Sequence, residues 1–167
     1  MKTQRRLGEK NLPRRSRKNA PHSGNGIDIV SAAQMLGFTS PNDFKAYFFK
    51  NFVWAKVYAQ RGNKEVRVMF SERSWDHVFW RDGVCFDLER AERMPWILEA
   101  LQRPEEIREG YSGVRDVYLL SKKKWGQDFC VIVRKPNHKG ASCFVTAYPP
   151  DLGTLIKIRV CHPLISK

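Results

Sequence analysis

This sequence has no long hydrophobic run. No stretch of its 167 residues approaches the roughly 18 consecutive apolar residues that a membrane-spanning helix needs. Its charged N-terminus is not followed by the apolar segment of a secretory signal. We therefore expect a cytoplasmic protein that has no membrane partner.

The sequence is also poor in the residue groups that bind metals or nucleotides. It has no H-x-x-x-H motif, no Cys/His cluster and no tight group of acids. The Gly24-Asn25-Gly26 segment lacks the lysine and the preceding strand of a phosphate-binding loop. We expect neither a metal nor another cofactor.

Four cysteines occur outside any C-x-x-C pair and favour buried free thiols in a reducing compartment: Cys85, Cys130, Cys143 and Cys161.

Acidic residues are scarce relative to basic ones. The chain has 17 Asp and Glu against 30 Lys and Arg, a net charge of +13, which favours a polyanionic partner such as nucleic acid. Residues 1–19 hold eight basic side chains and one acid, so the rest of the chain still carries +6. The full chain has 42% hydrophobic residues, which is enough for a packed core.

Three segments are expected along the chain. Residues 1–26 are rich in Pro, Gly, Ser and Asn and are predicted to be a disordered basic tail. The tail is either an arm that binds nucleic acid, through residues such as Arg14 and Arg15, or a solubilising linker. Residues 27–60 are predicted to be an N-terminal helical segment, and residues 61–167 an α+β domain.

Two helices are predicted in the second segment. One covers residues 27–38, and the other begins at the N-cap Ser40, has Pro41 in its first turn and runs to about residue 59. The aromatic face of the second helix favours core packing, and a groove for a partner is the alternative. As a unit, residues 27–60 could serve substrate targeting or be an antitoxin-like addition, and the sequence does not decide between these roles.

An antiparallel sheet of about four or five strands, packed against helices, is predicted for residues 61–167. Strands are expected at residues 65–70, 114–120, 128–134 and 141–148, with further candidates at 107–111 and 155–160 as an edge strand. A basic hairpin loop at residues 121–127 offers a nucleic-acid contact through Lys122, Lys123, Lys124 and Trp125.

Residues 71–103 concentrate the groups that could act on a phosphate. His77 lies in an aromatic helix that begins after Ser71. Pro95 suits the first turn of a further helix, and Arg90 and Arg93 lie just ahead of it, where a phosphate would meet guanidinium groups and helix N–H groups. The alternative for these arginines is a solvated charge run paired with Glu89 and Glu92.

Cleavage of RNA without metal requires a group that takes the 2′-OH proton, a group that protonates the 5′-oxygen, and a donor that stabilises the phosphate charge. Histidine suits the proton roles and arginine the phosphate role. His77 can instead be a core residue. Thr146, whose hydroxyl is a further candidate for the site, can instead be present only because threonine favours strands. Thr146 is expected to share a strand face with Phe144 and Tyr148, and Tyr118 is a candidate for base stacking or a proton role.

The order of these pieces resembles the phage-associated branch of the nuclease superfamily that groups barnase, EndoU, colicin and RelE enzymes. The resemblance covers about residues 66–148: a strand, the helix with His77, the Arg90-Ala91-x-Arg93 segment running into Pro-Trp-Ile, and a strand ending Phe-Val-Thr-Ala-Tyr148. It implies a small α+β domain, metal-independent RNA cleavage, a motif histidine at His77 and a hydroxyl at Thr146. It does not identify the general base, for which Glu89, Glu92 and Glu99 are candidates.

Three functions follow from these observations. The first is an endoribonuclease that leaves 2′,3′-cyclic phosphate ends and serves as a phage- or mobile-element-borne toxin, with RNA as substrate and an acidic inhibitor or antitoxin protein as a further partner. The second is a non-catalytic nucleic-acid-binding module. The third is a phage structural or interaction protein with an inactive nuclease-like fold.

Overall fold

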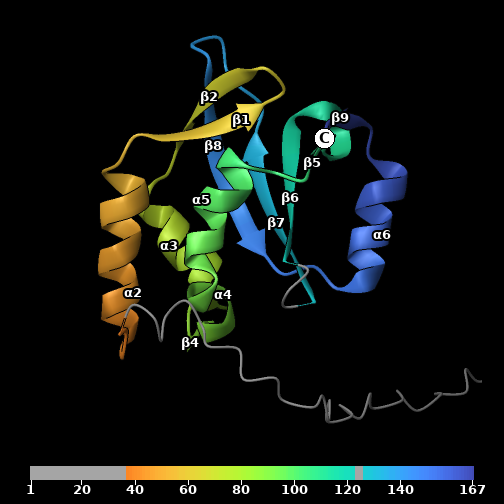
Figure 1. The fold of residues 1–167 in the computed structure, drawn as a ribbon. Coiled ribbons are helices and arrows are strands. Elements are labelled where there is room, and N and C mark those ends of the chain that lie inside the picture. Colours follow the sequence, from red (N-terminus) through yellow and green to blue (C-terminus); the bar gives the residue numbers. More distant parts are fainter. Residues whose placement is uncertain (1–36, 123–125) are drawn as a thin grey trace, which may run out of the picture.

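The computed structural model describes residues 37–122 and 126–167, which fold as an α+β unit. One mixed seven-stranded sheet forms the centre, and helices cover both of its faces (Figure 1). The helices are α2 (Pro41–Phe48), its π-helical continuation η1 (Phe49–Val53), α3 (Glu72–Phe79), α4 (Leu88–Glu92), α5 (Met94–Gln102), the 3₁₀ turn η2 (Tyr111–Gly113) and α6 (Leu152–Cys161).

The strand order of the large sheet is β1-β2-β8-β7-β6-β5-β9. In that order the strands are β1 (Val57–Arg61), β2 (Lys64–Met69), β8 (Ala141–Tyr148), β7 (Gln127–Arg134), β6 (Arg115–Lys122), β5 (Glu106–Glu109) and β9 (Leu164–Ser166). A separate two-stranded ladder pairs β3 (Trp80–Arg81) with β4 (Cys85–Phe86).

The prediction of a purely antiparallel sheet of four or five strands is wrong in strand count and direction. Neighbours from β8 to β9 are antiparallel, but β2 and β8 pair in parallel. More than 70 residues separate these two strands, so no hairpin fixes their direction. The parallel pair forms because the intervening chain packs its helices on the sheet and returns beside β2.

The second predicted helix begins as expected and ends earlier. The Ser40 N–H donates to Asp43 Oδ2 at 2.8 Å and the Asp43 N–H donates to Ser40 Oγ at 3.4 Å, a capping box. Helical structure ends at Val53 rather than near residue 59. From Val57 the chain is strand β1, because alternate residues from there are buried and pair with β2.

The prediction of an edge strand at residues 155–160 is also wrong, since this segment belongs to α6. Asp151 is its N-cap and accepts a hydrogen bond from the Thr154 N–H at 2.6 Å. Leu155 and Ile158 face the sheet, while other apolar residues of the helix are exposed. Because apolar residues lie on both sides of α6, the sequence shows no single helical face.

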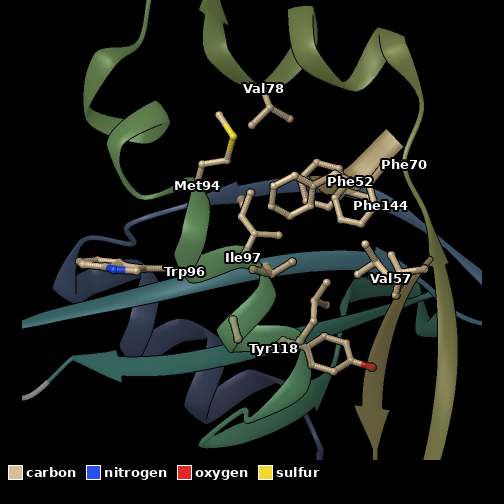
Figure 2. Close-up of a cluster of buried hydrophobic side chains, with 14 of the residues drawn as sticks. Phe52, Val57, Phe70, Val78, Met94, Trp96, Ile97, Tyr118 and Phe144 are labelled. Atoms are coloured by element: carbon tan, nitrogen blue, oxygen red, sulfur yellow. The ribbon is translucent and has the colours of Figure 1, made fainter. Parts of the chain in front are cut away.

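Side chains of β6 and β7 divide into two clusters on opposite sides of the sheet. We call the side packed by α2, α3 and α5 the core face and the other the α6 face. Figure 2 shows Ile97 and Trp96 of α5 with aromatic residues of the core face. Phe48 and Phe52, which precede the expected boundary at residue 60, stack at 5.2 Å in this same cluster.

Several predicted features lie outside the described residues: the tail at 1–26, most of the helix at 27–38, and Lys123, Lys124 and Trp125. Within residues 37–122 and 126–167, no helix is both long enough and apolar enough to cross a membrane. The four cysteines are free, as expected, but only Cys130 is fully buried, and Cys85 and Cys161 are exposed.

Candidate functional site

Two of the predicted site residues, Arg90 and Thr146, lie beside or on an open stretch of the edge of β8. Residues Arg67 to Met69 of β2 pair with the first three residues of β8, and the chain then leaves the sheet for α3. Among the described strands, none pairs with the rest of β8 on that side. Helix α3 contacts β8 there. This open edge allows helix side chains to reach the end of β8.

Arg90 connects three elements at this edge. Its Nη1 donates a hydrogen bond to the Val78 carbonyl at the end of α3, at 3.2 Å. Its Nε lies 3.4 Å from Asp87 Oδ2. Its guanidinium carbon lies 5.9 Å from the centroid of the Tyr148 ring, over the last residue of β8. Arg90 is therefore held beside α3, α4 and β8 while about a third of its side chain remains exposed, at 35%.

Asp87, which sequence reasoning missed, organises the arginines. It is the N-cap of α4 and accepts from the Arg90 N–H at 3.2 Å and from Arg81 Nε at 2.8 Å. Burial acts to raise the pKa of this carboxyl, but the hydrogen bonds and charges of Arg81 and Arg90 outweigh it, so the pKa lies below its ordinary value. An aspartate directly before a short helical run is an N-cap signal that could have identified it.

Arg93 is buried and its donors are largely used within the protein. Its Nε and Nη2 donate to Gln127 Oε1 at 3.1 and 3.0 Å, and its Nη1 donates to the Glu89 carbonyl at 2.5 Å. It also lies over the Trp96 ring, 5.6 Å from the centroid, and 3.4 Å from Glu89 Oε1. These contacts fix α4 to the start of β7 and leave Arg90 as the more accessible of the two predicted arginines.

His77 lies on the solvent side of α3. The buried residues of this helix are Ser74, Trp75, Val78 and Phe79, and His77 is exposed. This exposure rules out the alternative that His77 is a core residue. Its backbone adjoins the site directly, because the next residue, Val78, accepts the hydrogen bond from Arg90.

A β-bulge decides which way Thr146 points. Val133 pairs with Phe144 but Ile132 pairs with Thr146, so one extra residue of β8 lies between these pairs. Phe144 therefore faces the core cluster, whereas Thr146 lies on the α6 face with its cross-strand partner Ile132. The expectation that Thr146 shares a face with Phe144 is wrong. Its expected neighbour Tyr148 does lie on the α6 face.

Tyr148, rather than Tyr118, is the tyrosine at this edge. Tyr118 is 1% exposed in the core cluster (Figure 2), and burial first, then the charge of Asp116, raises its pKa. Tyr148 is half-buried; burial is the largest cause of its raised pKa, and Cys130 adds to it, while Arg90 opposes it. The Tyr148 hydroxyl thus stays protonated at neutral pH and can donate a hydrogen bond.

A polar groove of about 260 Å³ adjoins Arg93 between α4 and the start of α6. It is lined by Glu89, Arg93 and Gln127, among others. Of the three candidate general bases, Glu89, Glu92 and Glu99, only Glu89 lines this groove. Glu99 forms an ion pair with Lys122 instead. The same Lys122 ammonium lies 5.7 Å from the Trp96 ring centroid, so this predicted nucleic-acid contact is engaged within the fold.

Across residues 37–122 and 126–167, no group of three or more His, Cys, Asp and Glu side chains could hold a metal ion. Comparison with known proteins found no match to this chain among protein families, curated proteins or solved structures.

Proposed function

We propose that this protein is a metal-independent endoribonuclease whose active site is the open edge of β8. The observation that carries the proposal is the position of Arg90, which is fixed to the end of α3 and to Asp87 and lies over Tyr148. A partly exposed, pre-positioned guanidinium is suited to binding a phosphate through two parallel hydrogen bonds. The resemblance of residues 66–148 to the barnase, EndoU, colicin and RelE superfamily supports the same assignment.

In the proposed reaction the 2′-oxygen attacks the adjacent phosphorus, and the bond from phosphorus to the 5′-oxygen breaks. His77 is assigned as the base that accepts the 2′-OH proton. Arg90 stabilises the negative charge that develops on the phosphate oxygens. The hydroxyls of Thr146 and Tyr148 donate hydrogen bonds to the phosphate oxygens. The departing 5′-oxygen takes a proton from water, and His77 later releases the 2′-OH proton to the solvent, so the protons balance. The products are a 2′,3′-cyclic phosphate and a 5′-hydroxyl.

The test is incubation of the full chain with total RNA, in EDTA and separately in magnesium, followed by mapping of cut sites and end chemistry. We expect cutting in EDTA and cyclic phosphate ends, since arginine rather than a cation is assigned to the phosphate. Cleavage that EDTA abolishes and magnesium restores would contradict the mechanism.

A non-catalytic RNA-binding module is the second candidate, and the excess of basic side chains favours it. The two functions separate in one experiment, because a binding module retains RNA without shortening it. A phage structural role has no observation of its own in the described residues. An acidic inhibitor protein remains a predicted partner on the basis of net charge.

A further inference from the structure

Three exposed arginines form a row across the α6 face of the sheet, beyond the part that α6 covers. Arg115 of β6 pairs directly with Arg134 of β7, and Arg134 pairs with Cys143 of β8. On the other side of β8, Arg67 of β2 pairs with Ala141. The burial of alternate neighbours on the core face places all three arginines on the outer surface. We call these residues the arginine row.

Within the described part of the chain, no member of the arginine row forms an ion pair. Other basic residues near this end of the sheet are paired: Arg61 with Asp116, Lys135 with Glu109, and Arg108 and Arg159 with Glu106. None of the ion pairs formed by the described residues includes a member of the row. Two like charges directly opposite one another on neighbouring strands are unfavourable, so the row is suited to an anionic ligand.

The arginine row and the proposed active site share one continuous surface. Thr146 is the first residue beyond the bulge in β8, and its partner Ile132 is two residues from Arg134. A cavity of about 130 Å³ bridges the two regions, lined by Arg115, Ile132, Tyr148 and Lys157, among others. Its lining combines apolar side chains such as Ile132 and Ile158 with the cationic side chains of Arg115 and Lys157, which suits one aromatic base with its phosphate.

At the other end of the row lies an exposed aromatic side chain. Tyr58 of β1 pairs with Arg67 and is 41% exposed on the same outer surface. Because neighbouring strands lie about 4.8 Å apart, the path from Tyr58 on β1 to Arg115 on β6 crosses the sheet over about 19 Å, with a shift along β8 from Ala141 to Cys143. Proteins that bind single-stranded nucleic acids combine a row of cationic side chains, which contact the phosphates, with aromatic side chains, on which the bases stack.

We propose that the arginine row binds the backbone of single-stranded RNA that continues from the active site, with one base in the cavity and another on Tyr58. This inference rests on the proposed function for the identity of the ligand. It assigns substrate binding to Arg67, Arg115 and Arg134, none of which was a candidate from sequence.

The test uses the full chain and a fluorescent single-stranded RNA with 2′-O-methyl groups throughout, which cannot be cleaved by 2′-OH attack. The variant is Arg115→Gln with Arg134→Gln, and the control is Lys50→Gln with Arg103→Gln, which removes the same charge from exposed positions elsewhere. For single strands each phosphate contact contributes about 0.7 to the slope of log K against log salt. Loss of two contacts therefore lowers the slope by about 1.4 and weakens binding about 25-fold at 0.1 M salt.

Folding does not confound this test, because removal of two opposed charges should leave the melting temperature unchanged or higher. The control variant should keep a slope and affinity near those of the wild type. An unchanged slope for the row variant, or an equal loss in the control, overturns the proposal. So does equal affinity of the wild type for a duplex of the same length. Because the probe cannot be cut, these outcomes are separate from the cleavage test: a protein that binds through the row but never cuts overturns only the proposed reaction.

Discussion

Replacement of Arg90 by alanine separates catalysis from folding. The change removes a hydrogen bond to the Val78 carbonyl, an ion pair with Asp87 and the contact with the Tyr148 ring. A charged hydrogen bond and an exposed cation–π contact together suggest a cost of about 2 kcal/mol in unfolding free energy. For a chain of this size that cost lowers the melting temperature by about 4–8 °C. Loss of one donor to the transition state should slow cleavage about 10²–10³-fold.

The expected rate loss does not follow from the loss of stability. A domain with 5 kcal/mol or more of stability stays almost wholly folded after losing about 2 kcal/mol. A drop of a hundredfold at 25 °C therefore reports on the site. The assay is single-turnover cleavage of a short RNA, with melting curves measured on the same samples.

Arg81→Ala is the matched control. Arg81 donates to the same carboxylate, Asp87, at 2.8 Å, but its side chain is 66% exposed and it has no described contact with Val78 or Tyr148. It should lose stability to a similar extent and cut within a few-fold of the wild-type rate. If Arg81→Ala and Arg90→Ala lose activity equally, Arg90 acts only by holding α4 in place, and its assignment to the phosphate is refuted. Arg90→Lys, which keeps the charge but not the planar fork, should retain an intermediate rate.

Three further predictions concern other parts of the molecule. His77→Ala should slow single-turnover cleavage about 10²–10⁴-fold while the melting temperature stays unchanged, since the side chain is exposed, and a wild-type rate would remove His77 from the mechanism. Deletion of residues 1–20 should reduce RNA affinity and flatten its salt dependence, because residues 1–19 carry +7, and an unchanged slope would show that the tail is no binding arm. Asp87 has a folded-state pKa below its ordinary value of 3.8, so its contribution to stability is present above that pH and is lost as pH falls through the lower, folded-state pKa. Asp87→Asn should therefore show a smaller decline in unfolding free energy than the wild type on acidification below about pH 4, and equal declines would exclude this role.

Local signals in the sequence predicted the elements that local forces determine. The sequence predicts the strand at residues 141–148 and the helix after Arg93 correctly, because each pattern lies within one short segment. The strand shows alternating apolar and polar residues, and the helix shows apolar residues at helical spacing. The parallel pairing of β2 with β8 was not predictable in this way, because its free energy comes from contacts between segments far apart in the chain. Helix α6 was mistaken for a strand because Leu152 and Ile156 on its outer side are as apolar as Leu155 on its inner side.

The site itself shows how one local irregularity changes a functional assignment. Strict alternation along β8 puts Thr146 with Phe144 in the core, where its hydroxyl would have no access to a substrate. The extra residue at the bulge moves Thr146 and Tyr148 to the α6 face, and the early end of β2 leaves that part of β8 open to Arg90. The same shift gives Thr146 a surface in common with Arg134 and Arg115. Deletion of Val145 makes Thr146 the direct neighbour of Phe144, so plain alternation keeps Thr146 opposite Ile132 on the α6 face, and cleavage of a short RNA should survive this deletion. Loss of cleavage in a variant that still folds would show that the bulge itself, and not the face that Thr146 occupies, matters for the reaction.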